Sequence, residues 1–206
     1  MSELNDPSGR PEVSIVIVAY RAREHVLRCL ASLRENGGHS HEVIVVDDAS
    51  GDGTVEAVAE SFPEARVVAL SVNSGLPAGR NAALPLLKGA CVLMLDSDTE
   101  LTPGALASMK AVLDTRSEVG IVSPRLLFGD GTIQPSCRRW PALAIPFMRR
   151  GPYAKLHPDP AAHRRHMMSD FGFDRSRPVV STMGAAQMWR RELPALIGPY
   201  DERISS

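Results

Sequence analysis

The chain has 206 residues, enough for one domain with a sizeable core. Hydrophobic residues make up 44% and charged residues 23%, values typical of a soluble protein. A net charge of −1 gives no overall field that would attract nucleic acid, so we expect no nucleic-acid partner.

Cysteine usage and the N-terminus indicate the compartment. Three widely spaced cysteines without a CxxC pair are typical of a reducing environment. The polar N-terminus lacks the apolar core of a signal peptide, and no apolar run approaches the roughly 18 residues of a membrane span. We therefore expect a cytoplasmic protein.

The first half of the chain predicts strands that alternate with helices. β-branched apolar runs favour buried strands, and apolar residues at helical spacing favour amphipathic helices. Such alternation is typical of a mostly parallel α/β sheet with helices on both faces. We expect a disordered tail over 1–10, strands over 13–20, 42–46 and 66–70, helices over 21–36, 54–60 and 80–87, and a loop over 73–79.

A further buried strand, over residues 91–95, ends in Asp96-Ser97-Asp98. Ligands of open α/β sheets bind at the carboxyl ends of strands. Two carboxylates two residues apart can share a hard cation such as Mg²⁺ or Mn²⁺, commonly together with substrate phosphates. The alternative, a polar turn that caps the helix beginning near Pro103, stays open at this point.

The second half of the chain is less regular. Prolines and arginines are concentrated between residues 137 and 178, which predicts an irregular flap or loop that is either functional or mobile. We expect residues 11–206 to form a single domain. Around the irregular segment we expect a helix over 103–114, a strand over 119–123, a hairpin over 125–134, a strand over 179–182 and a helix over 190–197.

Four segments follow predicted strands and are therefore expected at one edge of the sheet: 19–20, 47–48, 73–81 and 96–98. A planar base would pack near Tyr20 while Asp48 accepts a hydrogen bond from a ring N–H. Gly75 would allow the backbone to approach a ligand closely. Arg80 would meet a phosphate or steady the Asp pair. Together these residues describe a site for a nucleotide diphosphate and a metal.

Each of these residues also fits a purely structural role. Tyr20 suits packing, Asp48 a helix cap, Gly75 a turn and Arg80 a surface charge. Other nucleotide sites are disfavoured, because the chain has no GxxxxGK[ST] loop and no glycine directly after its first strand. The latter absence argues against both a dinucleotide site and a nucleotidyltransferase.

The segments at 13–20, 42–54, 73–81 and 95–98, in this order, resemble family 2 glycosyltransferases, and the resemblance extends over roughly residues 13–201. It implies a GT-A fold, a UDP-, dTDP- or GDP-sugar donor, a divalent metal (Mn²⁺ or Mg²⁺) and transfer with inversion. It also implies a saccharide or lipid-linked acceptor and a role in cell-surface polysaccharide biosynthesis. The rhamnosyltransferase-like branch of the family is the most similar.

The resemblance assigns roles position by position. The metal pair would be Asp96 and Asp98, with Asp98 as the direct ligand. The acceptor side would include Gly184, Ala185 and Ala186. The nucleotide and donor sugar would contact Ala19, Tyr20, Asp48, Asn73, Gly75, Arg80, Asn81, Asp96 and Ser97.

The chain departs from the family at two places. Arg21 stands where the family commonly has Asn. The family's acidic catalytic base follows a segment similar to residues 198–202, and we expect it beyond Ser206, so no catalytic residue is assigned. If the chain is the whole protein, we expect metal-dependent nucleotide-sugar binding with little or no transfer. The alternative is a non-catalytic nucleotide-sugar-binding module or an inactive fragment.

The arginine-bearing segment over residues 138–165 predicts a contact outside the donor site. It suits an acceptor-binding flap, or a peripheral contact with an anionic lipid-linked acceptor at the inner face of the membrane. A solvated loop with a few apolar anchors is the alternative. The nearby histidines, His157, His163 and His166, do not have the spacing of a zinc site.

Overall fold

The computed structural model describes residues 10–38, 40–140 and 161–204. The chain divides into two compact units, one of residues 1–124 with 184–206 and the other of residues 125–183. The tail predicted over 1–10 lies outside the described residues except for Arg10. The single domain predicted over 11–206 stays a prediction.

The first unit is built on a six-stranded sheet with the order β3-β2-β1-β4-β10-β5. β1, β2, β3 and β4 pair in parallel, while β10 is antiparallel to both of its neighbours. The predicted mostly parallel α/β sheet is therefore confirmed. The strands are β1 (Val13–Ala19), β2 (His41–Asp47), β3 (Arg66–Ala69), β4 (Cys91–Asp96), β5 (Ile121–Val122) and β10 (Ala186–Arg190).

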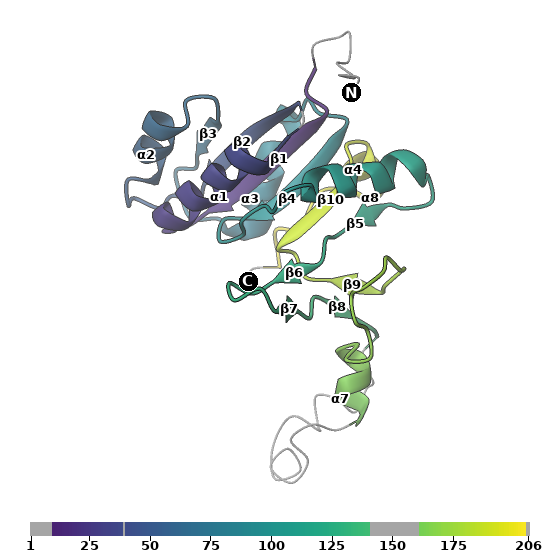
Figure 1. Cartoon of the computed structure of the whole chain (residues 1–206). Coiled ribbons are helices and arrows are strands. Elements are labelled where there is room, and N and C mark those ends of the chain that lie inside the picture. Colours follow the sequence, from purple (N-terminus) through teal and green to yellow (C-terminus); the bar gives the residue numbers. More distant parts are fainter. Residues whose placement is uncertain (1–9, 39, 141–160, 205–206) are drawn as a thin grey trace. The chain divides into compact units, whose positions relative to one another are not determined.

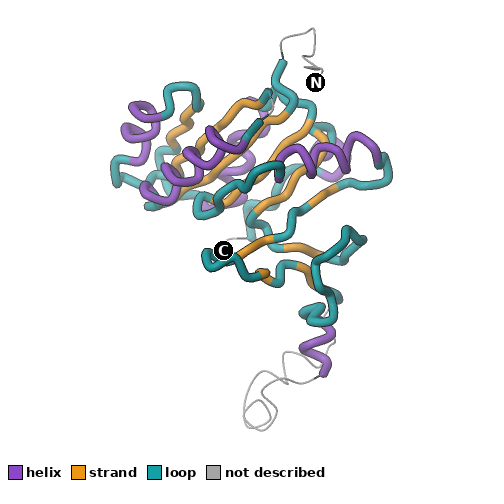
Figure 2. Tube along the Cα trace, viewed as in Figure 1, coloured by secondary structure: helices purple, strands orange, loops and turns teal. Residues whose placement is uncertain are grey.

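Helices cover both faces of this sheet (Figures 1 and 2). α1 and α4 lie on one face, and α3 and α8 lie on the other. On the α3 face, alternate strand residues such as Val16, Val92 and Met94 pack with Ala83 of α3 and Trp189 of β10. The helices are α1 (Arg23–Asn36), α2 (Thr54–Ser61), α3 (Gly75–Ala83), a 3₁₀ turn (Leu84–Leu86), α4 (Ala105–Thr115) and α8 (Leu193–Ile197).

Helix α3 begins earlier than the sequence predicts. Residues 75–79, predicted as a loop, form its first turns, and regular α-helix ends at Ala83 instead of residue 87. Pro77 fits the first turn because the N–H that proline lacks has no intrahelical partner there. The backbone N–H groups of Ser74 and Gly75, which also have no intrahelical acceptor, donate to the Asp48 carboxylate. This long-range cap sets the helix start and is invisible to local sequence patterns.

Gly79 brings α3 close to the sheet. A Cβ atom at this position would lie 2.5 Å from Cγ1 of Val18 in β1, so only glycine fits without displacement. This close approach seats the start of α3 against the carboxyl end of β1. The next residue, Arg80, is thereby placed near the end of β4.

The second unit contains more secondary structure than predicted. The predicted hairpin is confirmed as β6 and β7, which pair antiparallel. The prediction of an irregular 137–178 is wrong where β8 and α7 form, because β8 pairs with β9, which follows much later in the chain. The rest of that prediction falls partly on residues 141–160, outside the described residues. The elements are β6 (Leu126–Leu127), β7 (Ile133–Gln134), β8 (Cys137–Arg138), α7 (Ala161–His166) and β9 (Ser181–Thr182).

Across the described ranges, no helix is both long enough and apolar enough to cross a membrane.

Candidate functional site

One edge of the sheet collects most of the predicted site. The registers place Ala19 of β1 beside Asp47 of β2, and Val18 of β1 beside Asp96 of β4. Because β10 runs in the opposite direction, its first residue Ala186 pairs with Leu95 at the same edge. The segments predicted for base, metal and acceptor therefore end on adjacent strands.

Arg80 is buried at this edge, with 8% of its surface exposed. Its Nη2 donates to Asp96 Oδ1 at 3.1 Å and to the carbonyl oxygen of Gly184 at 3.3 Å. Its guanidinium carbon lies 5.4 Å from the centre of the Tyr200 ring. Arg80 thus joins the end of β4, the start of β10 and the C-terminal segment around one buried positive charge.

Asp96 and Asp98 form the predicted metal pair. Burial raises the pKa of Asp96, and the nearby Asp98 charge adds to the rise, while Arg80 opposes it. A cation would relieve both costs, since it compensates desolvation and the repulsion between carboxylates. Asp98 is exposed and Ser97 between them is half-buried. The pair therefore fits a divalent ion that takes further ligands from phosphate and water.

The described residues do not form a metal site made of protein ligands alone. Within residues 10–38, 40–140 and 161–204, no group of three or more His, Cys, Asp or Glu side chains is arranged to hold a metal. The two carboxylates are thus an open arrangement, of the kind that Mg²⁺ shares with substrate phosphates.

Asp48, predicted to contact the base, is buried with 2% of its surface exposed. Its Oδ1 accepts from the N–H of Ser74 at 2.7 Å, and its Oδ2 accepts from the N–H of Gly75 at 2.8 Å. Both oxygens therefore hold the start of α3. Asn73, just before this cap, is exposed. The base-binding role of Asp48 stays a prediction.

Asp47 has a different environment and was not predicted as a site residue. It is 4% exposed, its Oδ2 accepts from the N–H of Ser50 at 3.1 Å, and its Oδ1 has no hydrogen-bond partner among the described residues. Asp47 also lines a cavity of about 300 Å³ together with residues of the loop and first turn of α2. An orphaned carboxylate oxygen beside a cavity is a ready acceptor for a ligand N–H.

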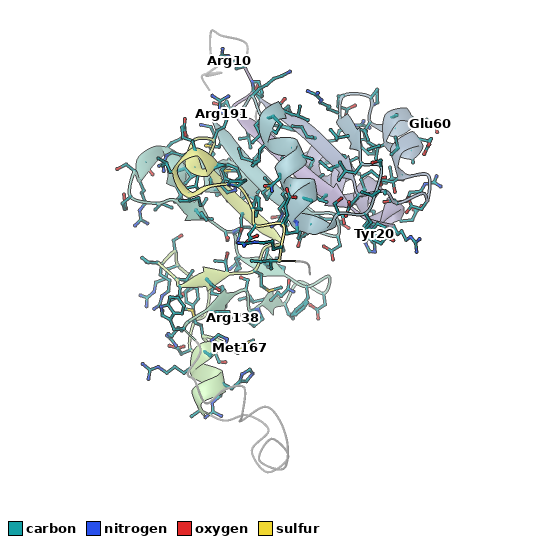
Figure 3. The ribbon with its side chains drawn as sticks, turned by 180° about the vertical axis from the view of Figure 1, so that it is seen from behind. Arg10, Tyr20, Glu60, Arg138, Met167 and Arg191 are labelled. Atoms are coloured by element: carbon teal, nitrogen blue, oxygen red, sulfur yellow. The ribbon has the colours of Figure 1, made fainter. Side chains whose placement is uncertain are left out.

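β1 ends at Ala19, and Tyr20, predicted as the last residue of the strand, follows it. Ala19 is buried, while Tyr20 is 46% exposed and lies at the molecular surface (Figure 3). The guanidinium of Arg21 lies 5.2 Å from the centre of the Tyr20 ring. Arg21 has a φ of +50° and donates its backbone N–H to Ser50 Oγ. The residue that departs from the family pattern therefore packs on the aromatic ring predicted to meet the base.

Asn81 contacts the C-terminal segment. Its Oδ1 accepts from the N–H of Tyr200, and its Nδ2 donates to the carbonyl oxygen of Tyr200 and to Glu202 Oε1. These three bonds, 2.8–2.9 Å long, fix the Tyr200 backbone next to Arg80. The structure therefore shows Asn81 as a support of residues 200–202, and the donor contact predicted for it stays a prediction.

The predicted acceptor segment is held against the metal pair. The backbone N–H of Asp96 donates to the carbonyl oxygen of Ala185 at 2.9 Å, and Gly184 receives the Arg80 bond. Ala186 is buried as the first residue of β10. Residues 184–186 thus lie beside Asp96, and their role on the acceptor side stays a prediction.

Comparison with known proteins identifies the family of the chain. The family model described as "Glycosyl transferase family 2" matches residues 14–173. The chain is 27% identical over 205 residues to an N-acetylglucosaminyl-diphospho-decaprenol L-rhamnosyltransferase of Mycobacterium tuberculosis, covering 92% of this chain and 64% of that protein. It is 28% identical over 166 residues to the uncharacterized glycosyltransferase YwdF of Bacillus subtilis, covering 79% and 61%. The chain thus spans less than two thirds of these relatives.

Solved structures give the fold. Residues 1–349 of TarS from S. aureus match with a TM-score of 0.62 at 21% identity, covering 95% of this chain and 52% of that one. The mannosyltransferase PcManGT of Pyrobaculum calidifontis, solved with GDP-Man and Mn²⁺, matches with a TM-score of 0.61 at 23% identity, covering 97% and 50%. Both are GT-A glycosyltransferases, which confirms the predicted fold. With the family model matching most of its length, the chain belongs to glycosyl transferase family 2.

Proposed function

We propose that this chain binds a nucleotide-diphosphate sugar and a divalent metal, as the donor half of an inverting glycosyltransferase. The observation that carries the proposal is the juxtaposition at one sheet edge of the orphaned Asp47 oxygen and the Asp96/Asp98 pair. A base held at the first and a diphosphate held at the second would span the strand ends of β2, β1 and β4. Family membership supports the same reaction class.

The nucleotide base would bind near Asp47. Uracil, thymine and guanine each carry a ring N–H that donates to a carboxylate, which suits UDP-, dTDP- and GDP-sugars alike. The cavity beside Asp47 and the exposed ring of Tyr20 supply a slot and a stacking face. Asp48 would support the base site indirectly, because its two hydrogen bonds hold the start of α3 in place.

The metal, Mn²⁺ or Mg²⁺, would be held directly by Asp98, and Asp96 would be the second carboxylate of the pair. When bound, such an ion stabilises the negative charge of a departing diphosphate. Arg80 keeps Asp96 in position through its 3.1 Å bond. Inversion follows if the acceptor hydroxyl attacks the anomeric carbon in line with the departing diphosphate, from the side of residues 184–186. PcManGT, solved with Mn²⁺, supports metal use in this fold.

The acceptor is proposed to be a saccharide on a lipid carrier. The Mycobacterium tuberculosis relative is named for a diphospho-decaprenol acceptor, and it aligns with 92% of this chain. An enzyme acting on such an acceptor would work in the cytoplasm, at the inner face of the membrane.

Calorimetric titration with UDP, dTDP, GDP and their sugars, with and without Mn²⁺, tests the proposal. We expect one nucleotide to bind in a Mn²⁺-dependent manner, Asp98→Ala to abolish the Mn²⁺ dependence, and Asp174→Ala, which changes an exposed Asp of the second unit, to behave as wild type. Absence of binding to every nucleotide would overturn it. Binding without transfer by a chain extended to the length of the relatives would favour the alternative, a non-catalytic nucleotide-sugar-binding module.

A further inference from the structure

A cavity lined by both charged and apolar side chains lies in the second unit. It has a volume of about 830 Å³, within the range of small-molecule sites. Its walls have two chemical characters. Three arginines, Arg139, Arg165 and Arg177, lie with His166 on the polar part, and Trp140, Met168, Val179 and Val180 lie on the apolar part. No Asp or Glu is among its described lining residues.

This unit is also strongly basic. Residues 125–183 hold ten Arg or Lys and four Asp, a net charge of +6, whereas the whole chain has a net charge of −1. The positive charge is therefore concentrated in this unit. A positively charged concave surface attracts anions and raises their local concentration.

Arg139 supports the cavity and is already neutralised. Its two Nη atoms bond both oxygens of Asp170, at 2.9 and 2.8 Å. Its backbone N–H donates to the carbonyl oxygen of His166, and its Nη1 also donates to that of Arg165. These bonds fix the end of α7 against β8, so Arg139 is part of the frame and not a free cation.

Arg165 and Arg177 are the other two arginines that line the cavity. Both are exposed, and the described part of the chain gives neither a hydrogen-bonded carboxylate partner, although the charge of Arg177 interacts with that of Asp170, which is bonded to Arg139. Arg177 is oriented, because its guanidinium carbon lies 5.2 Å from the centre of the Phe171 ring. Both arginines line the cavity, and a guanidinium group binds the oxygens of a diphosphate through paired hydrogen bonds.

The apolar lining residues of the cavity suit a hydrocarbon part of the ligand. Trp140 is 80% exposed and Val180 is 47% exposed, whereas Met168 is 2% exposed at the cavity floor. Covering such a tryptophan with hydrocarbon is favourable because it removes apolar surface from water. A free anion would leave this surface wet.

We propose that this cavity binds the diphosphate of a lipid-linked acceptor and the first apolar units of its lipid. Arg165 and Arg177 take the diphosphate, and Trp140 with its apolar neighbours takes the hydrocarbon. A single amphiphile satisfies both walls, which neither inorganic diphosphate nor a flat bilayer surface does. The inference rests on the proposed function for its biological meaning, but the binding itself does not.

Trp140 provides a direct readout. The chain has two tryptophans, and the other, Trp189, is 3% exposed in the core of the first unit. Titration with farnesyl diphosphate should shift the Trp140 emission to shorter wavelength in a saturable manner. Arg165→Gln and Arg177→Gln should each weaken binding about tenfold, the loss of one charge-assisted contact. Arg175→Gln, an exposed arginine outside the cavity lining, should bind as wild type.

A second pair of variants tests the apolar wall by calorimetry. Trp140→Ala should weaken farnesyl diphosphate binding while Phe128→Ala, which removes another exposed aromatic of this unit, should not. Equal affinity for inorganic diphosphate would overturn the lipid contact, and equal binding of vesicles of anionic phospholipid would identify a membrane surface instead. No saturable binding would overturn the whole inference. Mn²⁺-dependent nucleotide binding, measured on the same variants, reports the donor site separately.

Discussion

The carboxylates of Asp47 and Asp48 have different partners, although the two residues are adjacent. Both oxygens of Asp48 accept from the backbone of the α3 start, whereas Asp47 keeps one buried oxygen without a partner among the described residues. The first arrangement stabilises the fold. The second leaves a desolvated acceptor whose cost a ligand can relieve.

Isosteric substitutions should separate these two roles. Asp48→Asn loses one of two charge-assisted acceptors and should lower the free energy of unfolding by about 1–3 kcal/mol. Asp47→Asn keeps an acceptor for Ser50 and removes a buried charge, so stability should hold while nucleotide affinity falls. Urea unfolding and nucleotide titration of both variants measure this. Equal stability losses in the two would contradict the assignment.

Strand and helix periodicity predicted the parallel strands β1, β2, β3 and β4, whereas β10 was not predicted and takes in Arg190, the first residue of the helix predicted over 190–197. The apolar runs of β1, β2 and β4 are each buried, and parallel strands of this kind leave little ambiguity. The strand order also predicted that residues 19–20, 47–48 and 96–98 lie at one edge, where the registers bring them, but it did not place residues 184–186 there.

Contacts between distant residues were not predictable. The start of α3 depends on Asp48, 26 and 27 residues earlier, and β8 forms only because β9 pairs with it. The roles of the two adjacent aspartates could not be distinguished from the sequence. Strand alternation predicts that their side chains face different sides, but it does not predict which carboxylate is left without a hydrogen-bond partner. Pairing and burial, and not local pattern, decide these features.

We expect the hydrogen-bond geometry of Arg80, which positions Asp96, to be needed for nucleotide binding in addition to its positive charge. Arg80→Lys keeps a cation but has one donor group in place of a planar fork, so it cannot reach Asp96 and Gly184 with the same geometry. We expect Arg80→Lys and Arg80→Gln both to weaken Mn²⁺-dependent nucleotide binding, and the Gln variant also to lose stability. Arg203→Gln, at an exposed arginine paired with Asp201, serves as control and should change neither. Wild-type binding by Arg80→Lys would show that charge alone suffices.

Gly79 should be intolerant of a side chain. Gly79→Ala places a Cβ 2.5 Å from Val18 Cγ1, so α3 must move or Val18 must leave its rotamer, at a cost of about 1–3 kcal/mol. Gly120→Ala has no atom within 4 Å of the added Cβ and should be nearly neutral. Thermal unfolding of the two variants gives the comparison. Equal melting temperatures would mean that α3 can shift freely on β1.

Arg190 and Arg191 are adjacent arginines with unequal structural roles. Arg190 donates to the carbonyl oxygens of Leu113, Arg116 and Val119, and so joins β10 to the end of α4. The side chain of Arg191, at the surface (Figure 3), donates to the carbonyl oxygen of Lys88. Arg190→Ala should cost about 2–3 kcal/mol and Arg191→Ala under about 0.5 kcal/mol, measured by urea unfolding. Similar losses would show that the α4 contacts are replaced by water.

Cys29 should make the stability of the first unit fall at alkaline pH. Burial raises the pKa of this thiol from 9.0 to about 12, with smaller contributions from the charges of Glu100 and Asp98. Between these values the unfolded chain loses the proton and the folded chain keeps it, so the free energy of unfolding decreases as pH rises. Cys29→Ala leaves a cavity whose cost is independent of pH, and it should remove this part of the slope. Urea unfolding from pH 8 to 11 tests the difference, and parallel pH profiles for wild type and variant would show that Cys29 ionises as readily in the folded protein.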